Sequence, residues 1–261
     1  MWPGNQSLQK KGKPLRIKRN GNQDAVAEQH QIRLNPNKIT LILGVIAATI
    51  VGLGLVLQIM YYTTDLDNYL LYLDFLFNVD DELNIPSYFS SVILLFAAIL
   101  LTAITYLKVN AKDKFRRHWM LLMIGFYVLA ADEMITLHEH LNKPFKQLMG
   151  NNTSGIFTFA WVIPGMIIVA ALGLTFIRFL SKLPKSTRMG FMLGGFFYVG
   201  GALGVEMLGA NYATTHGMLN MNYALFTIVE ESSEMLGVII FIHALLCYIK
   251  NSYRELTLDF K

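Results

Sequence analysis

Six long apolar stretches, separated by short polar segments, dominate the pattern of residues along the chain. Each is long enough to cross a hydrocarbon core of about 30 Å as a helix that rises about 1.5 Å per residue. Helices are expected because backbone groups in lipid must find hydrogen-bond partners within their own segment. The pattern predicts an all-α, six-helix transmembrane bundle with spans at about residues 39–60, 87–107, 119–140, 155–177, 189–209 and 222–249.

The composition agrees with this pattern. The chain has 261 residues, of which 54% are hydrophobic and only 15% are charged, and its mean hydropathy is positive. These values are typical of a multi-pass membrane protein. We expect one membrane domain, residues 38–250, between a disordered basic cytoplasmic tail at 1–37 and a short cytoplasmic tail at 251–261.

The lysines and arginines of the loops indicate the orientation. The loops after the second and fourth spans are rich in Lys and Arg, whereas the loops after the first and fifth spans have none. Basic loops stay on the cytoplasmic side of a membrane. The alternation predicts that both termini are cytoplasmic, in a protein of the bacterial plasma (inner) membrane.

The carboxylates inside the apolar stretches are the feature of the sequence that most needs an explanation. They lie late in the third stretch, near the end of the fifth and at the start of the sixth, and no Lys or Arg lies within those spans. An isolated carboxylate in lipid costs roughly 2.5–3.5 kcal/mol on insertion scales, so these groups must be protonated, solvated or bound to cations. With the neighbouring histidines, the candidate site residues are Asp132, Glu133, His138, Glu139, His140, Glu206, Glu230, Glu231 and Glu234.

The depths of these clusters predict that they meet. With both termini inside, Asp132 lies roughly 20 Å along the third helix and Glu206 roughly 25 Å along the fifth, counted outward. The sixth helix runs inward, and its glutamates lie roughly 12–18 Å from its outer end. All three clusters therefore fall in the outer leaflet, where we expect one site.

Crowded carboxylates beside imidazoles suggest a metal. Such a mixed ligand set suits iron, manganese or zinc, although the Glu-x-x-His spacing of di-iron bundles is absent here. The leading hypothesis is a divalent metal (iron, manganese or zinc) held by the nine candidate residues, with Glu133 and Glu231 as catalytic groups. Such a centre would serve as a metal-dependent oxidase or hydrolase of a lipid-like substrate.

Other functions explain the same acids. They would also suit a proton- or cation-coupled transporter, a non-catalytic membrane subunit that contacts a partner, or a polar network at the membrane interface. Against transport, the cytoplasmic half of the spans is almost wholly apolar, with His243 as the exception. The expected partners are membrane lipid and a lipid-like small molecule, with no nucleic acid.

Two further segments have structural interpretations. Leucines and phenylalanines among the acids of residues 65–85 predict a short helix on the outer surface. The acids at 80–82 could reach the site or bind calcium at the surface, and a solvated loop is the favoured interpretation. The spacing Gly200-x-x-x-Gly204 in the fifth span favours close helix packing.

The histidines of the third span pose a conflict. On an ideal helix that continues to residue 140, His140 shares the face of the acids and His138 points away from it. A wide turn near the end of this helix would bring His138 back to that face.

The motifs around the acids resemble a known pattern. The combination Asp132-Glu133-x4-His138-Glu139, Gly-Ala-Leu-Gly-x-Glu206 and Glu230-Glu231-x-x-Glu234-Met-x-Gly is similar to a family of uncharacterised bacterial six-span integral membrane proteins. Residues 84–91 also resemble that family, and the resemblance covers roughly residues 65–250. It implies no established activity, but it pairs His138 with Glu139.

Overall fold

The computed structural model describes residues 35–64, 67–150 and 153–252, so most of the two predicted tails lies outside it. In this part of the chain all regular structure is helical and no strand is present. The helices are α1 (Pro36–Thr63), α2 (Asn68–Phe77), α3 (Ile85–Asn110), α4 (Arg116–Ile135), α5 (Leu137–Leu148), α6 (Val162–Lys182), α7 (Lys185–Val199), α8 (Glu206–His216) and α9 (Met221–Ser252), with a 3₁₀ turn η1 (Gly155–Phe157) and a π-helical segment η2 (Gly200–Val205).

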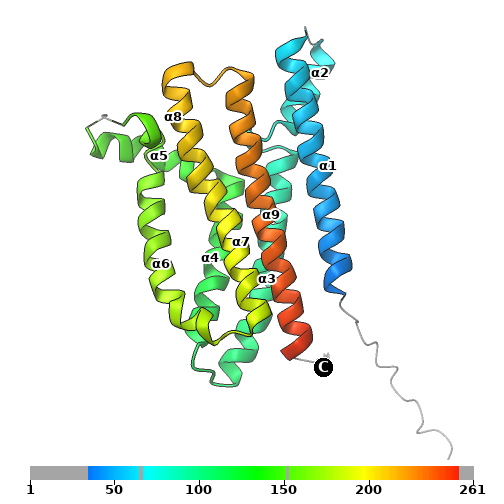
Figure 1. The fold of residues 1–261 in the computed structure, drawn as a ribbon, viewed down its shortest axis with the longest axis vertical. Coiled ribbons are helices and arrows are strands. Elements are labelled where there is room, and N and C mark those ends of the chain that lie inside the picture. Colours follow the sequence, from blue (N-terminus) through cyan, green and yellow to red (C-terminus); the bar gives the residue numbers. More distant parts are fainter. Residues whose placement is uncertain (1–34, 65–66, 151–152, 253–261) are drawn as a thin grey trace, which may run out of the picture. The chain divides into compact units, whose positions relative to one another are not determined.

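Six helices are long and apolar enough to cross a membrane (Figure 1). They are α1, α3, α4, α6, the continuous helix made by α7, η2 and α8, and α9. The all-α, six-span prediction is therefore confirmed. The predicted short helix before the second span is also present as α2, which starts where the Asp67 carboxylate accepts a hydrogen bond of 2.9 Å from the Leu70 N–H.

Helix α9 is the centre of the bundle. About 61% of its most apolar window is buried inside the protein, against 11–39% for the other five spans. It packs against α1, α3, α7, η2 and α8. An acid on the first half of α9 is consequently surrounded by protein rather than by lipid.

An aromatic layer crosses the bundle below the acids of α9. The ring of Phe241 stacks on Phe126 of α4 with centroids 4.6 Å apart and lies 4.3 Å from Phe191 of α7. Trp119, which is 1% exposed, continues the layer toward the end of the bundle that carries the basic loops. This layer separates the two ends of the bundle with large apolar side chains.

Close packing of α7 and η2 on α9 depends on glycines other than the predicted pair. A Cβ added to Gly194 would lie 2.8 Å from the Gly237 carbonyl oxygen, and one added to Gly201 would lie 2.8 Å from the Glu230 carbonyl oxygen. At Gly200 and Gly204 the same atom would meet nothing within 4 Å. The prediction for Gly200 and Gly204 is wrong because these two residues face away from α9.

The third span ends earlier than predicted. Helix α4 stops at Ile135 because Thr136 adopts left-handed backbone angles, φ 52° and ψ 42°. A new helix, α5, starts at Leu137 and continues past Pro144, where the sequence predicted that the helix would already have ended. The fourth span also begins later than predicted, at Val162.

Candidate functional site

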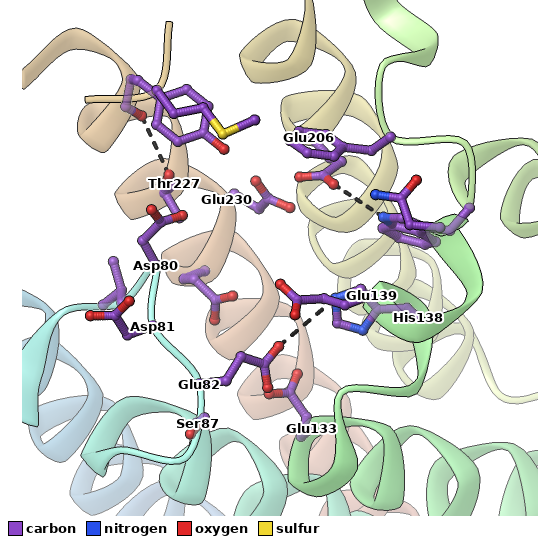
Figure 2. Close-up of a pocket in the computed structure, with 17 residues that line it drawn as sticks. Asp80, Asp81, Glu82, Ser87, Glu133, His138, Glu139, Glu206, Thr227 and Glu230 are labelled. Carbon is purple, nitrogen blue, oxygen red and sulfur yellow. Dashed lines mark hydrogen bonds and ion pairs between the residues drawn. The ribbon is translucent and has the colours of Figure 1, made fainter. Parts of the chain in front are cut away.

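Six parts of the chain line a cavity of about 420 Å³ at the end of the bundle where α9 begins. They are the segment 79–87, the end of α4 with the start of α5, the segment 159–161 before α6, the start of α8, the turn at Met218, and the first turns of α9 (Figure 2). Among the described residues, no Lys or Arg lines the cavity, and its titratable lining is one histidine, one tyrosine and eight acids: His138, Tyr223, Asp80, Asp81, Glu82, Glu133, Glu139, Glu206, Glu230 and Glu231.

The loop between α2 and α3 contributes three of these acids. Asn84 caps α3 by accepting from the Ser87 N–H at 3.2 Å, and its amide donates to the Asn78 carbonyl at 2.5 Å. Val79, only 5% exposed, anchors the loop in the protein, so that Asp80 and Glu82 point into the cavity (Figure 2).

The alternative that residues 80–82 reach the site is therefore the one that the structure supports, although Asp80 stays exposed and Asp81 and Glu82 are half-buried. The sequence contained one signal for this position of the loop. Val79 is an apolar residue among polar ones, in a short connection between two helices. It indicates a loop held against the bundle rather than one extended into solvent.

The break between α4 and α5 positions His138. The Asp132 carboxylate accepts the His138 backbone N–H at 2.9 Å and faces the His138 Nδ1 at 2.9 Å. The imidazole also lies 5.0 Å from the Trp161 ring, between centroids. The left-handed residue Thr136 brings His138 to the acids, which a regular helix cannot do.

Among the residues that the structure describes, His138 and Glu82 form the one cation–anion contact between lining side chains of the cavity. The His138 Nε2 is 3.9 Å from the Glu82 Oε1. Burial alone lowers the pKa of His138, but the hydrogen bond with Asp132 and the surrounding carboxylates outweigh burial and raise this pKa above its ordinary value. His138 therefore carries a positive charge over a wider pH range than a free histidine.

The pKa values of two loop acids, Glu82 and Asp80, are also raised. Burial raises the pKa of Glu82 to about 7, and His138 offsets only part of that shift. Burial likewise raises the pKa of Asp80, although a hydrogen bond with Thr227 works against it. The Glu82 Oε2 is buried and has no hydrogen-bond partner in the part of the chain that the structure describes.

The acids of α8 and α9 form the opposite wall. The Trp161 Nε1–H donates to the Glu206 Oε1 at 3.2 Å, and Glu230 and Glu231 of α9 line the same cavity. This wall therefore brings three carboxyl groups from two helices together.

Three of the nine predicted residues lie outside the cavity. Asp132 hydrogen-bonds His138 from outside the cavity, and Glu234 is 9% exposed and packs against Gly201 of η2. His140 is exposed, and its Nδ1 lies 2.7 Å from the Thr136 carbonyl oxygen. The helix-wheel prediction is therefore reversed for the two histidines. The other six predicted residues line the cavity: Glu133, His138, Glu139, Glu206, Glu230 and Glu231.

The geometry does not support the predicted metal centre as the side chains lie. Across residues 35–64, 67–150 and 153–252, no three His, Cys, Asp or Glu side chains are grouped closely enough to hold a metal ion. Figure 2 shows the Glu82 and Glu133 carboxylates pointing toward one another near His138. The remaining acids are spread around the cavity walls.

Fold and cavity together define a six-span membrane protein with an acidic cavity near one end of its helices. Residues 41–249 match the family described as a domain of unknown function (DUF8692), so the chain belongs to that family. No curated protein and no solved structure matched the chain.

Proposed function

We propose that the chain is an integral membrane protein that binds a cation in the acidic cavity. The observation that carries the proposal is the convergence of eight acids, with only His138 as a balancing basic group among the lining residues. Carboxylates of this number repel one another in a medium of low polarity, and a bound cation relieves that repulsion.

The size of the cavity bears on the class of cation. A volume of about 420 Å³ lies in the range of small-molecule sites, roughly 300–1,000 Å³. It accommodates an organic ammonium group or a hydrated metal ion, and it is far larger than one bare ion. The cavity therefore suits a bound cation that keeps other atoms around it.

The distribution of charge supports a cavity on the outer side of the membrane. The Lys residues of the loop 111–115, and the Lys and Arg residues of the helix ends that adjoin this loop and the Leu183-Pro184 connection, lie at the end of the bundle opposite the cavity. Because basic ends stay in the cytoplasm, the acids face outward, as the loop charges of the sequence also predict.

A divalent metal remains one form of this proposal. Iron, manganese or zinc would need Glu82, Glu133 and His138 to move closer together than they lie here. When bound, such a metal would polarise a substrate or activate water, and Glu133 or Glu231 would carry protons. Oxidation or hydrolysis of a lipid-like substrate is the reaction class we propose for that case.

Transport is a weaker candidate. A path from the cavity to the opposite end would have to pass the layer of Phe126, Phe191 and Phe241. Beyond it, His243 contacts Thr40 at 3.2 Å and Cys247 at 3.5 Å, which makes it a local polar group. Transport would require this aromatic layer to open.

Binding to the purified full-length protein in lipid nanodiscs tests the proposal. We would measure bound iron, manganese and zinc, and the rise in the unfolding temperature with added Mn²⁺, Zn²⁺ or tetramethylammonium. A ligand at 100 times its Kd adds about 2.7 kcal/mol of stability, which is readily detected.

Matched variants decide the location of the bound cation. Glu230→Gln and Glu231→Gln should abolish the effect, whereas Asp113→Asn, at the opposite end of the bundle, should retain it. The proposal is refuted if neither a metal nor an ammonium ion stabilises the wild type, or if all three variants respond alike.

A further inference from the structure

A second cavity, almost wholly apolar, lies next to the acidic one. It has a volume of about 600 Å³ and is formed by α4, α6, α7 with η2, and α9. Tyr198 carries the only polar side chain among its lining residues. We call this cavity the apolar groove.

Helix α6 meets α4 at the end of the bundle that carries the basic loops, where Phe176 lies against His118 and Phe179 against Trp119. It also touches α7 and η2, and the groove lies between these contacts. Four glycines widen it, since a Cβ added to Gly173, Gly195, Gly200 or Gly204 would meet nothing within 4 Å. Phe196 at the rim is 70% exposed, so the groove opens toward the surrounding lipid.

The groove follows directly on the acidic cavity along the helices. On α4, Leu129 of the groove and Glu133 of the cavity are four residues apart and share a face. On η2 and α8, Gly204 and Glu206 are two residues apart. One helical turn, about 6 Å, therefore separates the apolar site from the charged site.

Tyr198 lies at the end of the groove that is nearest the acids. It lines the groove, and its backbone lies against Gly237 of α9, three residues after Glu234. An apolar ring with a polar tip is the side chain expected at a boundary between a hydrocarbon chain and a polar head group.

We infer that the protein binds a single-chain cationic amphiphile, a long-chain amine or quaternary ammonium, with its head group in the acidic cavity and its alkyl chain in the apolar groove. The inference rests on the proposed cation site and names its ligand class. The negative cavity selects the positive head group, and the neighbouring lipid-facing groove selects the chain.

Photocrosslinking in nanodiscs tests this assignment with the full-length protein. The probe is a long-chain alkyltrimethylammonium with a diazirine at the end of its chain, and the comparison probe has the same chain on a neutral glucoside. Crosslinked residues are located by mass spectrometry. We expect the cationic probe to label groove residues of α4 and α6 about tenfold more than the neutral one, a ratio that needs about 1.4 kcal/mol of electrostatic attraction between the ammonium group and the carboxylates.

Groove-filling variants provide the matched control. Gly173→Leu and Gly195→Leu place side chains in open groove space and should remove the labelling, whereas Gly52→Leu, equally open but on α1, should leave it unchanged. Labelling spread evenly over lipid-facing residues, or insensitive to the groove variants, overturns the chain site.

The head-group site is tested separately. The double variant Glu230→Gln/Glu231→Gln should reduce the cationic probe to the level of the neutral one. Equal groove labelling by both probes in the wild type overturns the cation site and with it the inferred ligand class. Loss of labelling in both groove variants, together with loss of the charge preference in the double glutamine variant, supports the assignment. A double variant that keeps the charge preference overturns the head-group site.

Discussion

Two adjacent glycines, Gly200 and Gly201, should respond oppositely to the same substitution. A Cβ at Gly201 would lie 2.8 Å from the Glu230 carbonyl oxygen and 3.1 Å from the Glu234 Cγ. The nearer atom belongs to the backbone of α9, so η2 and α9 must separate. Overpacking of this kind costs about 1–3 kcal/mol.

At Gly200 the same methyl group meets open space. Replacing a glycine in a helical segment then lowers the entropy of the unfolded chain and stabilises the fold by about 0.4–1 kcal/mol. Gly200→Ala and Gly201→Ala should therefore differ in free energy of unfolding by about 1.5–4 kcal/mol, with the wild type between them.

Unfolding in detergent provides the measurement. The free energies of the two variants would be compared by denaturant titration under one set of conditions, with tryptophan fluorescence as the signal. Gly201→Ala should also weaken cation binding, because it displaces the turn that carries Glu230. Equal stability of the two variants would refute the packing of η2 on α9 described above.

Three further outcomes follow from the site. Because the pKa of Glu82 is raised, the folded protein holds a proton that the unfolded chain releases, so stability should fall as pH rises from about 4.5 to about 7. Glu82→Gln should flatten this slope in thermal unfolding, and a steeper slope would contradict the prediction. Asp132→Asn should lower the pKa of His138, measured by NMR of labelled histidine, while His140→Gln leaves that pKa unchanged. Thr136→Gly should stabilise the protein by up to about 1 kcal/mol, because glycine adopts the left-handed angles of Thr136 without steric cost, and a clear loss of stability would argue against this strain.

The sequence by itself determined the spans and the acids that belong together. Six apolar runs and the requirement for internal hydrogen bonding in lipid left a helical bundle as the only solution. Equal depth along antiparallel helices was enough to expect Glu133, Glu206 and Glu231 at one site, and all three line the same cavity. The positions of the spans and the depths of the acids follow from the length and hydrophobicity of each segment, which can be read from that segment alone.

Only the tertiary structure decided the details of the cavity. The left-handed backbone conformation of Thr136 decided whether His138 or His140 faces the acids. The regular period of a helix does not predict such a residue. The acids at 80–82 reached the cavity because Asn84 and Val79 hold their loop against the bundle. On α7 and η2, Gly194 and Gly201 let α9 approach, whereas Gly195, Gly200 and Gly204 leave the groove open, and the two sets differ in the side of the helix that they occupy. Such choices depend on contacts between segments far apart in the chain, and periodicity within one segment carries no information about them.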